Sequence, residues 1–156
     1  NLDIGLLIAG GLLIIFSLWW IYFDWPVDNP FDTLGHTFLW GYGHYFIFAA
    51  AAAVGAGLSV SIDQALHHAE IGATGAGLSV AIPVATYLIL LSCLHLHSYP
   101  GTLLQKALTP ITAALIRLVP FMGGPTALYI GLLQVVLITS KLIIRARSEG
   151  QASMTH

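Results

Sequence analysis

The sequence alternates between long apolar segments and short polar stretches. The first apolar segment carries no charged residue from Ile4 to Phe23, and about 20 such residues are what a helix needs to cross a bilayer. Further apolar segments occupy residues 34–62, 72–94, 102–119 and 125–144. This pattern predicts an all-α fold, a polytopic transmembrane bundle of about five helices in one domain, residues 1–147.

Segment 102–119 is the weakest candidate for a membrane-spanning helix because it contains Lys106, Pro110 and Arg117. If this segment is re-entrant, the number of spans falls to four. Residues 148–156 are polar and are expected to form a disordered tail. Because Lys141, Arg145 and Arg147 gather at the C-terminal end of the last segment and just beyond it, the positive-inside rule predicts a cytoplasmic C-terminus.

The amino-acid composition of the chain indicates the solvent in which it folds. Hydrophobic residues make up 57% of the chain and charged residues only 8%, whereas a soluble domain carries about 25% charged residues. The sequence therefore predicts an integral membrane protein surrounded by lipid. With 5 Lys+Arg and a net charge of -2, it offers no basic surface for a nucleic acid.

Small residues repeat on two neighbouring segments. Residues 55–60 (GAGLSV) recur unchanged as residues 75–80. Small side chains let helices approach closely in lipid. We expect one packing face made of Ala49, Ala53 and Gly57, and another that includes Gly75 and Ser79.

Histidines are the main candidates for chemistry. His36, Trp40 and His44 are four residues apart and share one helix face, while His95 and His97 close the third apolar segment. Intramembrane imidazoles can carry a proton or bind haem or chlorophyll. Histidines at a helix end can also simply anchor it at the membrane surface.

A second, weaker candidate lies between the second and third segments. On a helix, Asp63, His67 and Glu70 would share a face and could bind a divalent metal. Alternatively, Ser61 and Gln64 form a capping box that begins a short surface helix.

Two motifs resemble those of the bacterial low temperature requirement A (LtrA) family. Residues 19–24 (WWIYFD) are similar to its Trp-Trp-x-Tyr-Phe motif, through Trp19, Trp20, Tyr22, Phe23 and Asp24. Residues 42–45 (YGHY) resemble its Tyr-x-His element. The resemblance implies the carboxy-terminal half of a longer, multi-pass protein of the bacterial inner membrane. This element is followed by a small-residue helix that reaches Val54 and Gly55 and resembles the family's Ala/Val-Gly run. The acidic residue that the family often has shortly after this run is absent here, where residues 56–59 read AGLS.

Function remains open between three alternatives. The resemblance implies a permease-like or stress-related protein, in which His44, Trp40, Tyr45 and Asp24 would contact a polar substrate, a cation or a proton. A subunit that binds haem or chlorophyll through His44, His95, His36 or His97 is the second alternative. An accessory subunit that docks onto other membrane subunits, or onto a missing amino-terminal half, is the third. No phosphate-binding loop, nucleophile elbow or metalloprotease motif is present, so we expect no enzymatic activity.

Overall fold

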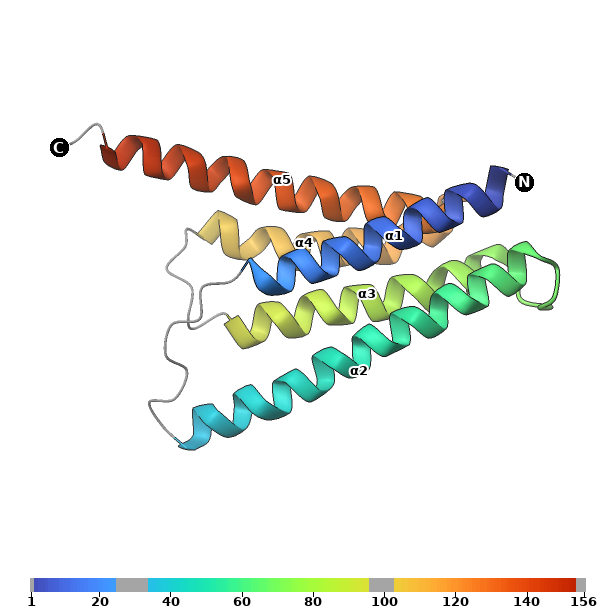
Figure 1. Ribbon diagram of the computed structural model, residues 1–156, viewed down its shortest axis with the longest axis horizontal. Coiled ribbons are helices and arrows are strands. Elements are labelled where there is room, and N and C mark those ends of the chain that lie inside the picture. The colour runs from blue at the N-terminus through green and yellow to red at the C-terminus, as the bar shows by residue number, and fades with distance from the viewer. Residues whose placement is uncertain (1, 25–33, 96–102, 154–156) are drawn as a thin grey trace.

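The apolar segments form helices in the computed structural model, which describes residues 2–24, 34–95 and 103–153 (Figure 1). Within these ranges no residue forms a strand, and the predicted all-α class is confirmed. The helices are α1 (Leu2–Phe23), α2 (Leu34–Ala65), α3 (Ala73–His95), α4 (Leu103–Leu118) and α5 (Thr126–Ser153), with a 3-10 turn, η1 (Val119–Phe121), after α4.

Four of the helices are long and apolar enough to cross a membrane: Leu2–Phe23, Trp40–Ala65, Ala73–Leu94 and Thr126–Ser148. Helix α4 has only 16 residues, or about 24 Å at 1.5 Å per residue. It nevertheless runs alongside α3 (Figure 1). The N-terminus and the C-terminus of the chain lie at opposite ends of the bundle. Helix α5 extends to Ser153, so residues 148–153, expected in the polar tail, are helical.

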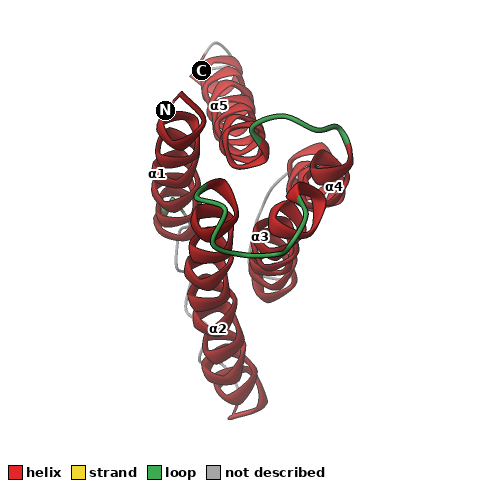
Figure 2. Cartoon of the chain, turned by 90° about the vertical axis from the view of Figure 1, so that its right-hand side faces the viewer, coloured by secondary structure: helices red, strands yellow, loops and turns green. Residues whose placement is uncertain are grey.

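The helices α1, α3 and α5 run in one direction and α2 and α4 run in the other (Figure 1). The most extensive contacts join α2 to α3, α1 to α5, and α3 to α4. Figure 2 looks onto the bundle end where the α2–α3 and α4–α5 loops lie. The contact between α1 and α5 is parallel, although these helices come from opposite ends of the sequence.

Helices α2 and α3 cross at a point where both carry small residues, glycine, alanine and serine. A Cβ atom at Gly57 would overlap the backbone carbonyl group of Ser79. The Ser79 hydroxyl lies 3.2 Å from the Gly57 carbonyl oxygen, and the Ser61 hydroxyl lies 3.2 Å from that of Ala76. Each hydroxyl also has a carbonyl acceptor in its own helix. The crossing thus combines close packing with hydrogen bonding, the two forces that hold helices together in lipid.

Helices α1 and α5 also meet through glycines. A Cβ at Gly10 would lie within 2.7 Å of the backbone of Leu128, and one at Gly131 would lie 2.7 Å from the Cβ of Leu13. A real Cβ atom does not come this close to its neighbours, so any larger residue at either position would push the two helices apart. These two glycines therefore fix the register between α1 and α5.

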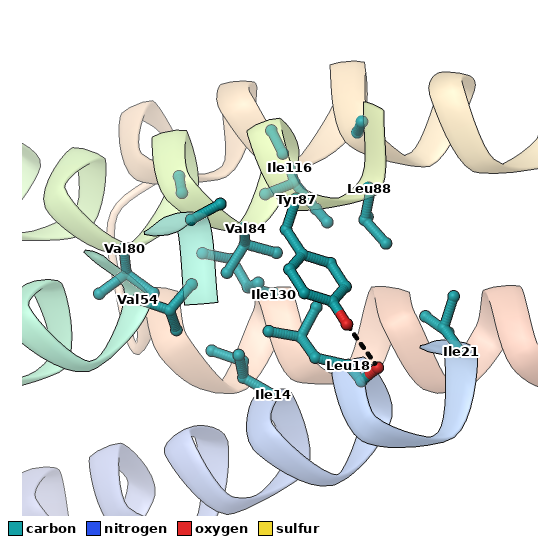
Figure 3. Packing of buried hydrophobic residues seen from close by; sticks show 14 of the residues in the cluster. Ile14, Leu18, Ile21, Val54, Val80, Val84, Tyr87, Leu88, Ile116 and Ile130 are labelled. Atoms are coloured by element: carbon teal, nitrogen blue, oxygen red, sulfur yellow. Dashed lines mark hydrogen bonds between the residues drawn. The ribbon is translucent and has the colours of Figure 1, made fainter. Parts of the chain in front are cut away.

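The core lies between the crossings and contains residues from all five helices (Figure 3). Tyr87 of α3 is buried, and its hydroxyl donates a hydrogen bond of 3.2 Å to the Leu18 carbonyl oxygen of α1. The bond ties two helices that otherwise make few contacts. Around it pack Ile14, Leu18, Ile21, Val54, Val80, Val84, Leu88, Ile116 and Ile130.

The predicted packing face of α2 is wrong in part. Gly57 is buried, but Ala49 and Ala53 are exposed, and Ala50 and Val54 face the core instead. The helix is apolar on all sides, so small residues alone do not identify the inward face. The repeated segments also pack differently, since a Cβ at Gly57 would meet the Ser79 backbone, while one at the equivalent Gly77 would meet the side chains of Pro120 and Thr126.

Replacing Gly57 with Ala should destabilise the bundle, whereas replacing Gly55 should not. The new methyl group at position 57 would overlap the Ser79 backbone, and such overpacking costs roughly 1–3 kcal/mol. Position 55 lies on the same helix with nothing within 4 Å. Thermal unfolding of both variants in detergent checks this, and equal melting temperatures would contradict the crossing described above.

Candidate functional site

His44 lies in an aromatic cluster near the bundle end where α1 and α3 terminate. Its ring centroid is 4.0 Å from that of Trp40 and 5.9 Å from that of Tyr22, with Phe48 at 6.2 Å. Tyr22 comes from α1, and the other rings belong to α2. The two motifs that carry the family resemblance therefore meet in space, Tyr22 from the first and His44 from the second.

The hydrogen bonding of His44 fixes which ring nitrogen is available. Its Nδ1 lies 2.7 Å from the Trp40 carbonyl oxygen. A carbonyl oxygen only accepts hydrogen bonds, so Nδ1 carries the proton. In the neutral ring, Nε2 is then the atom with a free lone pair. His44 can accept a proton, accept a hydrogen bond or bind a metal through Nε2.

The remaining aromatic residues of these motifs face outward. Trp19 and Trp20 are exposed, and the Trp19 ring packs against Phe23 at 5.2 Å. Tyr45 is 68% exposed and contacts Phe46, so among the residues expected to surround His44 only Trp40 is in ring contact with it. Exposed Trp and Tyr near a helix end are typical of the boundary between membrane and water.

Asp24 is held at the same end of the bundle by an ion pair. Its Oδ1 lies 3.3 Å from a guanidinium nitrogen of Arg145 on α5. Lys141, one helical turn earlier on α5, is close enough to interact electrostatically with both residues. The carboxylate expected to attract a cation is thus already partly neutralised by α5.

The other histidines of the predicted site lie at helix ends or beyond them. His36 lies in the first turn of α2 and His95 at the last residue of α3, but their side chains are outside the described part of the chain, as is all of His97. The backbone register is clear, because Gly43 contacts Leu94. His44 and His95 therefore lie on adjacent helices at similar depth.

The predicted alignment of Asp63, His67 and Glu70 is wrong. Helix α2 continues through Ser61 and ends at Ala65, so Ser61 and Gln64 do not begin a new helix either. His67 adopts a left-handed conformation with φ of 59°. Its N–H donates to the Gln64 carbonyl, and the His68 N–H donates to that of Asp63. This pair of hydrogen bonds is a Schellman motif, which ends a helix. Among the described residues no three His, Cys, Asp or Glu side chains are grouped to hold a metal.

A cavity of about 380 Å³ opens at the other end of the bundle, near the loops seen in Figure 2. It lies between the N-terminal turns of α1, α3 and α5 and the C-terminal end of α2. Its deeper wall is apolar and includes Leu7, Val80 and Ala127. Its polar side chains are Asp3, Ser61, Gln64, His67 and Thr126.

Sequence reasoning missed this cavity and one further residue, Gln134. Gln134 lies in the middle of α5 and is fully buried, and neither atom of its amide group has a hydrogen-bond partner among the described residues. The sequence does mark Gln134, because a single amide inside an apolar membrane segment is unusual. The cavity had no such signal, since it depends on how four helix ends converge.

The fold, with four helices able to span a bilayer, defines a multi-pass α-helical membrane protein. A family model, "Bacterial low temperature requirement A protein (LtrA)", matches residues 1–142. The chain therefore belongs to the LtrA family, as its two aromatic motifs indicated. Searches of curated proteins and of solved structures found no significant match.

Proposed function

We propose that this protein is permease-like and conducts a small polar solute across the bacterial inner membrane without chemistry of its own. The cavity at one end of the bundle carries this proposal. A volume of about 380 Å³ is in the range of small-molecule sites, and a few polar groups on apolar walls are typical of them. A helical bundle also fits the inner membrane, because outer-membrane proteins are typically β-barrels.

The distribution of basic residues supports an orientation for this path. Lys106, Lys141, Arg145 and Arg147 lie toward the bundle end that includes the C-terminal end of α5, and Arg117 lies toward the other. By the positive-inside rule the C-terminal end is then cytoplasmic. The cavity opens on the opposite, periplasmic side, where it would receive solute from outside.

His44 would act at the cytoplasmic side of the path. Its Nε2 is available because Nδ1 is engaged by Trp40, so it can contact the solute or relay a proton. The aromatic surface of α2 around Phe38, Tyr42 and Phe46 is exposed and would face lipid or further membrane subunits.

Replacing His44 with Ala should abolish transport without preventing assembly. The side chain is only partly buried, so its loss should change stability little, while the available Nε2 disappears. The measurement is solute uptake into proteoliposomes, together with size-exclusion chromatography of the purified variant. The matched control is His68→Ala. His68 is exposed in the loop between α2 and α3, at the other end of the bundle, so this variant should transport normally.

Substitution of His44 by Gln distinguishes the two roles. An amide can hydrogen-bond a solute but cannot relay a proton at neutral pH, so retained transport would indicate contact and lost transport a relay. Normal transport by the alanine variant would rule out both.

A cofactor-binding membrane subunit is the second candidate. The hydrogen bond from Nδ1 to a carbonyl is the arrangement that orients a ligating histidine, and His44 has it. The depth match between His44 and His95 on adjacent helices would let a macrocycle bridge α2 and α3.

A visible absorption spectrum of protein extracted gently from its native membrane tests this candidate. If a macrocycle is bound, absorption bands should persist through purification and disappear in His44→Ala. A colourless protein would exclude haem and chlorophyll and leave the permease proposal unaffected.

A further inference from the structure

The inward face of α5 runs from the cavity to the cytoplasmic ion pair, and its polar residues are Gln134, Lys141 and Arg145. Ala127, at the cavity wall, is buried, as are Ile130, Gln134 and Leu137 at steps of three and four residues. The same face continues to Lys141 and Arg145, which are half-buried. A single helix face thus connects the cavity, a buried amide and the cytoplasmic ion pair.

An apolar layer separates the cavity from Gln134. Ile14, Val84 and Ile130 are all fully buried and lie together in the core (Figure 3). Val84 and Ile130 follow the cavity-lining Val80 and Ala127 by about one helical turn. Val80 borders both the cavity and this layer. Three branched side chains at this level would keep water out of the bundle interior in the conformation seen here.

Below this layer the bundle becomes polar again. Contacts of Gly10 and Gly131 set the register of α1 and α5, which places Gln134 within about one helical turn of Ser17 in depth. Ser17 is also buried, and the carbonyl oxygen of the adjacent Leu18 accepts a hydrogen bond from the Tyr87 hydroxyl. Three helices therefore contribute hydrogen-bonding groups at one level of the membrane.

The amide of Gln134 has no stabilising role that the structure shows. It is fully buried, and neither its Nε2 nor its Oε1 has a partner among the described residues. A buried polar group without a partner destabilises a fold, and in membrane segments such groups mark substrate paths.

We propose that Gln134 is the internal contact site for the solute, and that the solute is a small uncharged molecule with both donor and acceptor groups. This inference rests on the permease function proposed above. The amide offers one acceptor and a donor pair, which match such a molecule. No charged side chain is buried at this depth among the described residues, so an ion would lose its hydration without compensation.

The test compares Gln134→Met with the wild-type protein in proteoliposomes. Methionine has a similar shape without the amide, so the solute loses its hydrogen-bond partner but the core stays filled. Stopped-flow light scattering measures the permeability to urea and glycerol, and ion flux assays measure sodium and chloride. Thr139→Val is the matched control, because Thr139 is exposed on the same helix and bonded to the Val135 carbonyl.

Wild-type protein should pass urea or glycerol faster than empty vesicles do, and sodium and chloride no faster. Gln134→Met should lower this solute permeability by about tenfold, the effect of losing one buried hydrogen bond in the path, and Thr139→Val should leave it unchanged. The methionine variant should also melt at the same or a higher temperature, since an unpaired amide has been removed.

Other results would separate the two proposals. Full permeability of Gln134→Met would overturn the assignment of Gln134 while leaving the permease function standing. A lower melting temperature of that variant would show that the amide is structural. Preference of the wild type for sodium or chloride would overturn the solute class, and permeability no higher than that of empty vesicles for every probe would remove both proposals.

Discussion

The crossing of α2 and α3 at Gly57 and Ser79 determines much of the remaining structure. In lipid, apolar side chains gain little by leaving the solvent, so helices associate where their backbones can approach. Here the Gly57 backbone touches that of Ser79, and two serine hydroxyls bond carbonyl groups across the contact. This crossing sets the register of α2 against α3, which brings Gly43 level with Leu94 and sets the depth of His44.

The second crossing, at Gly10 and Gly131, plays the same part for α1 and α5. Its parallel register continues along both helices until Asp24 meets Arg145. At the other end, the same pairing brings the first turns of α1 and α5 together around the cavity. Both bundle ends that carry polar groups are therefore organised by contacts between glycines and backbone in the membrane interior.

Several features of this structure follow from the sequence. The five apolar segments predicted the helices to within a few residues, except at the C-terminus of α5, because long runs without charge leave few alternatives in a membrane. The two aromatic motifs predicted the family. The importance of Gly57 and Ser79 followed from their size.

Other features depend on information that a sequence does not contain. A helix that is apolar on all sides has no distinct hydrophobic face, which is why the small residues Ala49 and Ala53 predict a packing face that Ala50 and Val54 form instead. The way in which α2 ends is not evident from the sequence, because its Schellman motif uses His67 where glycine is usual. The cavity and the depth of Gln134 depend on which helices pair, and the parallel pairing of α1 with α5 joins segments more than a hundred residues apart.

Passage of a solute through the bundle requires that the interior near Gln134 can be reached from the cavity. The most direct measurement is the reactivity of Gln134→Cys, in a background where Cys93 is replaced by Ala, toward a small neutral thiol reagent added from the cavity side of sealed vesicles. We predict that this cysteine is modified by the neutral reagent and more slowly by a charged one of similar size. If Ala127→Cys at the cavity wall reacts while position 134 reacts with neither reagent, Gln134 is sealed within the core and no path passes it.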